Sequence, residues 1–411
     1  MTRPRALVIG GSLGGLFAAS LMRAIGWDAV VFERVEGDLG SRGAGIGTRE
    51  ELFAVMQRIG ACVDDTIGVE VTQRICLDRA GAIVHEVTVP QFMSAWARIY
   101  RPLKAALPSD CYRSGMPLAS VEQDVGTVTA VFADGSRERG DLLIGTDGIH
   151  STVRQQLIPE AQPLYAGYVA WRGVIEERRI APATHALLFE KYTFCLPEGE
   201  MMLSYPVPGR DNDVRAGHRD YNFVWYRPVA RERLPDLCTD AVGRQHGVSI
   251  PPPLIRREII EAMRADARAL LAPQIAEIVG QVTEPFFQPI FDLESPRLVF
   301  GRVVLLGDAA FVARPHVGAG VTKAALDAQS LAQAIAEAAG DLPSALARYD
   351  RERRHFGAQL VARARRLGAY LEAQSKPPEQ RTESERTQRP EVVMREIGAA
   401  LFRIEDFTPG V

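Results

Sequence analysis

The sequence is poor in the features that mark secreted, metal-binding and membrane proteins. Cysteine occurs only five times in 411 residues, at scattered positions with no Cys-x-x-Cys pair. This pattern argues against a disulfide framework and a zinc site, and it favours a reducing compartment. No apolar run is long enough to span a bilayer. The apolar strand Ala6–Gly10 begins the fold almost at once, which leaves no secretory signal. We therefore expect a cytoplasmic protein without a metal ion.

The chain also lacks a large excess of charge of either sign. The formal net charge is −3, with 48 basic and 51 acidic residues, so no charge surplus favours nucleic acid or an anionic membrane. Hydrophobic residues make up 46% of the chain, enough for a large core. The length alone suggests two or three structural units.

A glycine-rich turn near the N-terminus is the first feature with a chemical meaning. The run Gly10-Gly-Ser-Leu-Gly-Gly15 follows a strand at Ala6–Ile9 and opens a helix over Leu16–Ile25. Glycines let the backbone approach a pyrophosphate, and the helix start offers free N–H groups. Ser12 replaces the usual second glycine, and its hydroxyl can itself donate to phosphate. Glu33 ends the second strand, at the spacing expected for a carboxylate that holds ribose hydroxyls.

A second motif of strand, turn and helix lies near the other end of the chain. The apolar strand Gly301–Leu306 stops at Gly307-Asp308, and Gly318–Lys323 opens a helix. Asp308 would stand at the carboxyl end of a parallel strand, where α/β sheets bind ligands, and can accept hydrogen bonds from polyol hydroxyls. Together the two motifs predict a flavin dinucleotide extended across one domain. A helix start beside an anionic reduced flavin would stabilise it.

The predicted elements indicate an α/β fold: a discontinuous Rossmann-like FAD-binding domain with an inserted antiparallel-sheet substrate domain and a C-terminal helical segment. We predict that the domains span these ranges: 1–75, 97–165 and 295–340 for FAD binding, 76–96 and 166–294 for the sheet, and 341–411 for the C-terminal helices with a flexible linker at 375–390. Within them we expect a strand at Ala186–Phe194, helical structure over 254–281 and a last amphipathic helix at Glu391–Phe407.

The order and separation of these motifs resemble the single-component FAD-dependent aromatic hydroxylases, the flavoprotein monooxygenase class that includes p-hydroxybenzoate hydroxylase. An Asp147-Gly148 turn after the strand Leu142–Gly145 fits the same order. The likeness covers nearly the whole chain to about residue 370. Four further segments look like hydroxypyridine hydroxylases of the 2,6-dihydroxypyridine 3-hydroxylase type: Tyr165–Gly173, Tyr205–Arg210, Asn222–Tyr226 and Arg314–His316.

The resemblance implies a set of cofactor-binding residues. The pyrophosphate loop would comprise Gly10, Ser12, Leu13, Gly14 and Gly15, and Glu33 with Arg34 would hold the adenosine ribose. Leu118 occupies the position where a backbone group meets adenine. Those expected beside the flavin are Gly45 and Gly47 in the loop from Ala44, Asp308 on the ribityl chain, and Gly318, Gly320 and Val321 at the ring. Two departures from the family pattern are Tyr100, where many relatives have arginine, and Phe311, where a histidine is usual.

The resemblance also implies the reaction. FAD would be reduced by NADH or NADPH visiting transiently and would react with dioxygen to a C4a-hydroperoxide, which hydroxylates an electron-rich ring such as a hydroxypyridine or phenol. We take His316 and Tyr205 as candidate catalytic residues, because a loop histidine can move a proton near neutral pH. The candidate substrate-binding residues are Trp225, Pro315, Phe311 and Glu200. Arg172 is a weaker candidate.

Several alternatives stay open. The same scaffold supports other flavin reactions, such as epoxidation or oxidative ring modification, and a flavin-bound sensor without turnover. The sequence does not name the ring or choose between NADH and NADPH. It leaves open whether His316 acts as a base or only positions the substrate, and whether the chain forms a homodimer. The tail after Ser375 could cap the active site, mediate a dimer or stay mobile.

Overall fold

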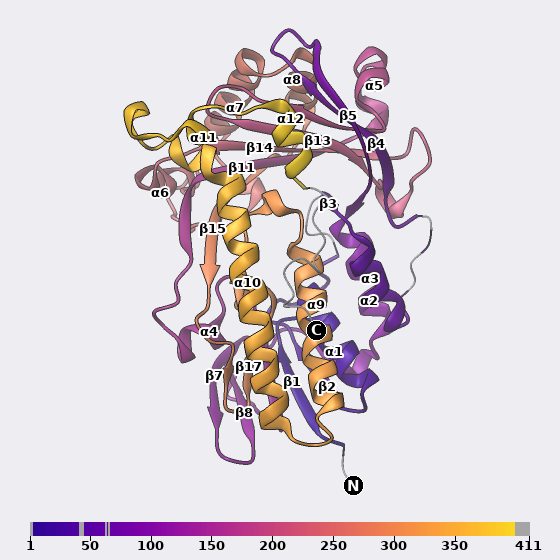
Figure 1. The fold of residues 1–411 in the computed structure, drawn as a ribbon, viewed down its shortest axis with the longest axis vertical. Coiled ribbons are helices and arrows are strands. Elements are labelled where there is room, and N and C mark those ends of the chain that lie inside the picture. The colour runs from indigo at the N-terminus through magenta and orange to yellow at the C-terminus, as the bar shows by residue number, and fades with distance from the viewer. Residues whose placement is uncertain (1–2, 41–44, 62–63, 65, 399–411) are drawn as a thin grey trace.

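The computed structural model describes residues 3–40, 45–61, 64 and 66–398, which form two sheet-based halves joined by a long helix (Figure 1). The lower half contains a six-stranded sheet. Its strands, in spatial order, are β16 (Val299–Phe300), β17 (Val303–Leu305), β10 (Leu142–Gly145), β1 (Arg5–Ile9), β2 (Asp28–Phe32) and β6 (Tyr112–Arg113). All neighbours pair in parallel except β16 with β17. The central strands β10 and β17, and β1 and β2 after their first residue, are continuous apolar runs because both faces of the sheet are covered.

Helices pack on this parallel sheet and complete the lower half. Because the sequence predicts a dinucleotide site in these residues, the lower half is called the nucleotide-binding half below. The helices of this half are α1 (Leu13–Ala24), α2 (Glu50–Arg58), α3 (Trp96–Ala106), α4 (Thr152–Leu157) and α9 (Gly320–Glu337). Helices α1 and α9 contact each other, although about 300 residues separate them. A three-stranded antiparallel sheet adjoins the parallel sheet and consists of β7 (Leu118–Gln123), β8 (Val128–Phe132) and β9 (Arg137–Gly140). The predicted strand, glycine turn, helix and second strand at the N-terminus are confirmed as β1, α1 and β2, which form a βαβ unit.

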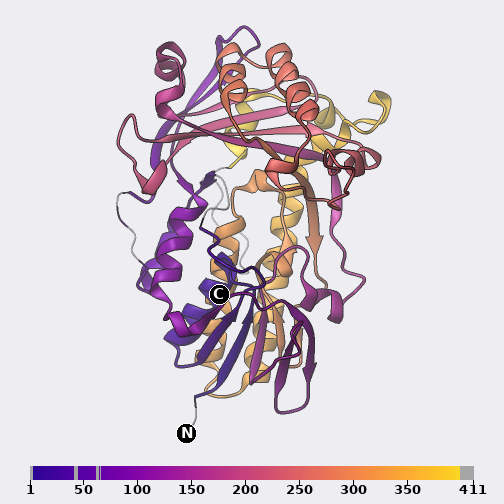
Figure 2. The ribbon, with the colours of Figure 1, turned by 180° about the vertical axis from the view of Figure 1, so that it is seen from behind.

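The upper half is a nine-stranded mixed sheet (Figures 1 and 2). Its strands, in spatial order, are β18 (Phe311–Val312), β15 (Phe286–Glu294), β11 (Leu164–Glu176), β14 (Asp220–Pro228), β13 (Met201–Val207), β12 (Lys191–Cys195), β4 (Val69–Leu77), β5 (Ile83–Ala95) and β3 (Gly45–Gly47). Only β12 and β4 pair in parallel. The central strands β13 and β14 are buried on both faces.

Two different layers cover the faces of this sheet. Helices α7 (Arg257–Leu270) and α8 (Pro273–Gln281) pack on the outer face, where Trp171 and Trp225 lie in their core. The inner face turns toward the nucleotide-binding half and carries Tyr205 and Tyr226. Successive side chains of a strand point to opposite faces, so each strand contributes to both layers.

The C-terminal part of the chain spans both halves. Helix α10 (Leu342–Ala373) runs along the molecule from the parallel sheet to the nine-stranded sheet (Figure 1). After it come α11 (Glu383–Arg386) and α12 (Pro390–Glu396), which lies against β4 and β5. Within the described ranges, no helix has the length and apolar character needed to cross a membrane.

Four expectations from the sequence require correction. Residues Pro182–Leu188 form a helix, α5, because Pro182 suits a helix start, so only Lys191–Phe194 of the predicted strand Ala186–Phe194 lies in a strand, β12. The helical stretch over 254–281 is broken before Pro273, which disfavours a helical conformation at Ala272. The predicted linker contains α11, whose Glu385 pairs with Lys376 at 2.9 Å. The predicted last helix ends at Glu396, and residues 399–407 lie outside the described residues.

The predicted boundary at residue 75 also differs from the strand pattern. It cuts through β4, which belongs wholly to the nine-stranded sheet, as do β3 and β18. We therefore propose that the sheet domain begins before Val69 and that the short strands β3 and β18 are shared at the junction of the two halves.

Candidate active site

Two cavities lie where the two halves meet. The first has a volume of about 570 Å³ and adjoins the glycine turn after β1. The second has a volume of about 260 Å³ and lies between the inner face of the nine-stranded sheet and the start of α9. Ile46 and Arg172 line both cavities, so an elongated ligand entering the two would pass these side chains.

The first cavity has the construction of a dinucleotide site. Gly10 and Ser12 line it, and Ser12 is the N-cap of α1 without a hydrogen bond from its side chain to the helix. Leu13, Gly14 and Gly15 do not line it and lie behind the turn. A Cβ on Gly15 would overlap the carbonyl oxygen of Gly10, so this glycine lets the helix pack tightly against the turn.

The carboxylate of Glu33 organises this turn. Its Oε2 accepts a hydrogen bond from the backbone N–H of Gly11 at 2.7 Å, and its Oε1 accepts one from that of Val35 at 2.9 Å. Each carboxylate oxygen can accept a further bond, so Glu33 fits a ribose hydroxyl as well. Arg34 and Leu118, two further residues that the resemblance implies at the adenosine end, line the same cavity.

Asp147 adds a carboxylate to the first cavity, and only one of its two oxygens has hydrogen-bond partners among the described residues. Its Oδ2 accepts hydrogen bonds from the backbone N–H groups of Thr152 and Val153, at the start of α4. Its Oδ1 is buried, faces no hydrogen-bond partner in the described residues, and belongs to a side chain that lines the first cavity. A buried acceptor without a partner fits the presence of a ligand hydroxyl.

The second cavity brings together the residues expected beside the flavin ring. Gly45 and Gly47 line it from β3, whereas Ala44 lies outside the described residues. The other residues expected beside the flavin, Asp308, Gly318, Gly320 and Val321, also line it. Asp308 is exposed and pairs with Lys323 at 3.3 Å. Gly318 adopts a left-handed conformation with φ of 59° and turns the chain into α9, whose first N–H groups suit an anionic ring.

Gly45 permits a close approach between β3 and the strands β13 and β14 of the same sheet. Its N–H donates to Oδ1 of Asn222 at 3.3 Å, and a Cβ at this position would lie 2.7 Å from a ring carbon of Tyr205. Strand β3 therefore lies directly against the aromatic wall of the cavity.

That aromatic wall consists of side chains from the inner face of the sheet. Its residues are Met93, Tyr192, Leu203, Tyr205, Val224 and Tyr226. The rings of Tyr192 and Tyr205 meet edge to face, with centroids 5.2 Å apart. Burial raises the pKa of Tyr205 to about 12, so its hydroxyl keeps its proton at neutral pH. Such a wall suits a small flat ring and keeps water out.

Arg172 supplies the positive charge of this cavity. It lies on β11, is half-buried, and its Nε is buried without a hydrogen-bond partner. The charge of Arg172 opposes the upward shift in the pKa of Tyr205 and of Tyr226, which places the guanidinium near both phenols. The other two charged side chains in the described lining, Asp308 and Arg314, are already paired.

His316 lies outside the cavity lining. It is 1% exposed, its Nε2 shares a hydrogen bond of 2.7 Å with the hydroxyl of Tyr168, and its ring packs on that of Tyr226. Burial, and secondarily the charge of Arg314, lowers the pKa of His316 to about 3. A neutral, enclosed imidazole is poorly suited to exchange protons with a substrate. The geometry therefore argues against the predicted catalytic role of His316, whereas Tyr205 does line the cavity.

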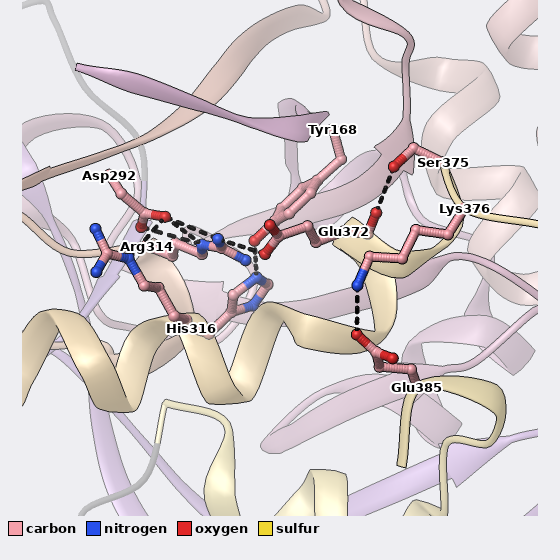
Figure 3. A network of polar contacts seen from close by, with 9 residues as sticks. Tyr168, Asp292, Arg314, His316, Glu372, Ser375, Lys376 and Glu385 are labelled. Atoms are coloured by element: carbon pink, nitrogen blue, oxygen red, sulfur yellow. Dashed lines mark hydrogen bonds and ion pairs between the residues drawn. The ribbon is translucent and has the colours of Figure 1, made fainter. Parts of the chain in front are cut away.

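A network of ion pairs holds the loop that contains His316 (Figure 3). Arg314 donates to Asp292 through Nε and Nη2, the latter at 2.7 Å, and also to Glu372 at 2.6 Å near the end of α10. Its neighbour Pro315 lines the cavity, as predicted for a substrate contact. These ion pairs hold the loop that precedes α9. His316 therefore lies in a packed layer behind the cavity.

Three predicted substrate contacts are placed elsewhere by the structure. Trp225 is fully buried on the outer face, one residue out of phase with Val224 and Tyr226. Glu200 accepts from Nε of Arg227 at 2.9 Å, and burial raises its pKa, but it does not line the cavity. Phe311 lies in the core of the nucleotide-binding half, against Gly357 of α10. These three side chains do not reach the site that the other residues define.

The tail after α12 completes the cavity. Ile397 and Gly398 line it, and the N–H of Gly398 donates to the carbonyl oxygen of His316 at 2.7 Å. Of the possibilities that the sequence leaves open for the tail, the described residues thus place this part at the candidate active site.

Comparisons with known proteins agree with this geometry. A family model described as FAD binding domain-like matches residues 165–292. The 2,6-dihydroxypyridine 3-monooxygenase of Paenarthrobacter nicotinovorans is 31% identical over 373 residues, which cover 90% of this chain and 92% of that protein. The structure of 2,6-dihydroxypyridine-3-hydroxylase from Arthrobacter nicotinovorans matches with a TM-score of 0.85 and 29% identity, over 95% of this chain and 98% of that one.

A second solved structure carries the cofactor. Klebsiella pneumoniae HpxO, complexed with FAD and uric acid, matches with a TM-score of 0.75 and 25% identity, over 96% of this chain and 94% of that one. The chain belongs to the FAD-dependent aromatic hydroxylases. It is an FAD-binding monooxygenase of the kind that hydroxylates aromatic or heteroaromatic rings.

Proposed function

We propose that this protein uses NADH or NADPH and dioxygen to hydroxylate a small, electron-rich ring that carries an ionisable hydroxyl group, such as a hydroxypyridine or phenol. The observation that carries the proposal is the second cavity. An aromatic wall, Arg172, which has no ion-pair partner among the described residues, and the start of α9 enclose one space. FAD, when bound, supplies the reducing electrons and the activation of oxygen.

Arg172 and Tyr205 have separate tasks in this proposal. A guanidinium near the ring hydroxyl favours the ionised form and lowers the pKa of the substrate, which enriches the ring in electrons. Tyr205 stays protonated and donates a hydrogen bond to the same anionic oxygen. Both residues act on the substrate oxygen, so no histidine base is required.

The cofactor contacts follow from the two cavities. Gly10, Ser12, Glu33, Arg34 and Leu118 would hold the adenosine and pyrophosphate end. The residues that would hold the ribityl chain and ring are Asp308, Gly45, Gly47, Gly318, Gly320 and Val321. The backbone N–H groups at the start of α9 favour negative charge on the ring.

A substrate screen tests the proposal. The FAD-loaded protein is mixed with hydroxypyridines and phenols, and oxidation of NADH and NADPH, oxygen uptake and product mass are measured. We expect at least one ring to stimulate both oxidation and oxygen uptake and to gain one oxygen atom. Stimulated oxidation without any oxygenated product would contradict hydroxylation and favour another flavin reaction.

A further inference from the structure

Arg74 is a fully buried arginine whose hydrogen bonds lead to the C-terminal segment. It lies on β4 and is 0% exposed. Its Nη1 donates to the carbonyl oxygens of Met394 at 2.6 Å and Ile397 at 2.8 Å. Its Nη2 donates to Oε1 of Gln91 at 2.7 Å and reaches the carbonyl oxygen of Gly398 at 3.5 Å. No salt bridge to Arg74 occurs among the described residues.

A buried charge without a counter-ion costs free energy unless dipoles replace the solvent. The carbonyl groups at the end of α12 are such dipoles, since a helix C-terminus carries partial negative charge and favours a cation. Burial lowers the pKa of Arg74, in line with that cost. The arrangement therefore ties the end of α12 to the sheet at one defined place, and loss of the segment would remove the three carbonyl oxygens that accept from the guanidinium.

The same segment is bound on its other side to the flavin-facing loop. Besides the bond from Gly398 to His316, Nε2 of Gln91 donates to the carbonyl oxygen of Gly398 at 3.0 Å. A Cβ on Gly318 would lie 3.1 Å from Cα of Gly398, so the two backbones nearly touch. The segment thus bridges β4 and β5 to the turn before α9.

One side chain of this segment faces the substrate space. Ile397 is 3% exposed, lines the second cavity, and belongs to the same core as Tyr192 and Tyr205. Val392, on the same segment, is 38% exposed and does not line the cavity. The two aliphatic side chains offer a matched comparison.

We propose that residues 390–398 form a wall of the substrate cavity in which Ile397 sets the size of the ring that is accepted. Arg74 is the positioning residue that holds this wall closed. The inference rests on the proposed function for its substrate. The hydrogen-bonded attachment of residues 390–398 to Arg74, called the clamp below, does not rest on it. Removing the Ile397 side chain beyond Cβ would open space beside the ring and let water reach it.

The clamp is tested first, without a substrate. Hydrogen exchange is measured on FAD-loaded wild-type protein and on Arg74→Met, which keeps much of the side-chain volume. We expect faster exchange at the amides of Ile397 and Gly398, while the strands of the parallel sheet keep their protection and FAD stays bound. Unchanged exchange at both amides would overturn the role of Arg74. If Arg74→Met does not fold, Gln91→Leu, which removes one of the bonds to Gly398, is measured in the same way.

The size filter is tested with a substrate from the screen and a bulkier homologue. We expect Ile397→Ala to improve kcat/KM for the bulkier ring relative to the smaller one by about tenfold or more. It should also raise the hydrogen peroxide released per NAD(P)H with the smaller ring, whereas Val392→Ala should change neither quantity. Arg74 acts through Ile397 in this proposal. Any change in KM that Arg74→Met causes should therefore be smaller in a protein that already carries Ile397→Ala.

The outcomes separate the two proposals. If no ring stimulates NAD(P)H oxidation, the proposed function fails and the size filter fails with it, although the exchange experiment still decides the clamp. If the enzyme hydroxylates a ring and Ile397→Ala behaves like Val392→Ala, only the present inference is overturned.

Discussion

The hydroxyl of Tyr168 lies 2.7 Å from Nε2 of His316, and neither residue lines the substrate cavity. The pair packs behind Tyr226, which does line it. The histidine that the sequence suggests as a catalytic base thus supports the aromatic wall from behind. Arg172 and Tyr205, which we propose act on a ring hydroxyl, do line that cavity.

A first prediction concerns the stability of the protein in acid. His316 has a pKa lowered to about 3 in the folded chain, against about 6.5 in an unfolded one. Between these values only the unfolded chain binds the proton. The contribution of His316 to the free energy of unfolding is therefore complete above about pH 6.5 and falls as the pH drops toward 3, by at most about 1.4 kcal/mol per pH unit. Denaturant titrations should show a shallower decline for His316→Gln. His218→Gln, at a side chain that is 60% exposed, should leave the decline unchanged.

A second prediction concerns the charge of Arg172. Arg172→Met should raise the pKa of the bound ring hydroxyl and shift the rising limb of the kcat profile to higher pH by about 1 to 3 units, because kcat reports groups in the enzyme–substrate complex. Arg172→Lys should restore part of the shift. Arg178→Met removes an arginine whose side chain is 75% exposed and serves as a control. A profile that does not move in Arg172→Met would show that this charge does not act on the substrate.

A third prediction separates the two faces of the nine-stranded sheet. Tyr205→Phe should lower kcat/KM by about 10- to 100-fold, the value of one hydrogen bond to a charged group, with little change in Tm. Trp225→Phe should leave KM unchanged and destabilise the protein by about 1 to 3 kcal/mol, because it opens a gap against α7 and α8. Kinetics and thermal unfolding on both variants check this, and the reverse pattern would place the substrate on the outer face.

A fourth prediction concerns the glycine turn. Gly15→Ala should weaken FAD binding by about tenfold or more, since its Cβ would overlap the carbonyl oxygen of Gly10 and move the turn. Gly280 is an exposed position in α8 where a Cβ would meet open space, so Gly280→Ala should keep FAD affinity and slightly raise Tm. Titration of the apoprotein with FAD measures both. Equal affinities would mean that the tight packing at Gly15 does not shape the cofactor site.

The sequence predicts the nucleotide-binding half well because its signals are local. A run such as Ala6–Ile9 followed by Gly10 determines a strand and a turn within a few residues, and the position of Glu33 follows from the same unit. Spacing along the chain is then enough to place these residues around one cavity.

The substrate side is less predictable because it depends on strand phase and distant contacts. Tyr205 and Trp225 are both aromatic residues on neighbouring strands, and only the register of β13 with β14 shows that they face opposite ways. The alternation of side chains along a strand predicts that Ala170, Arg172 and Val174 share one face of β11. It does not say which face of the sheet turns toward the nucleotide-binding half. The bonds from Arg74 to residues more than 300 positions away leave no local signal at all.

The proposed reaction inserts one atom of dioxygen into an aromatic ring that carries an ionisable hydroxyl. Its sharpest test is turnover of a ring from the screen under oxygen-18 gas, with mass analysis of the product. We expect one labelled atom to enter the ring, and Arg172→Met to lower the yield of this product per NAD(P)H consumed. A product without the label, or with oxygen derived from water, would contradict the proposed reaction.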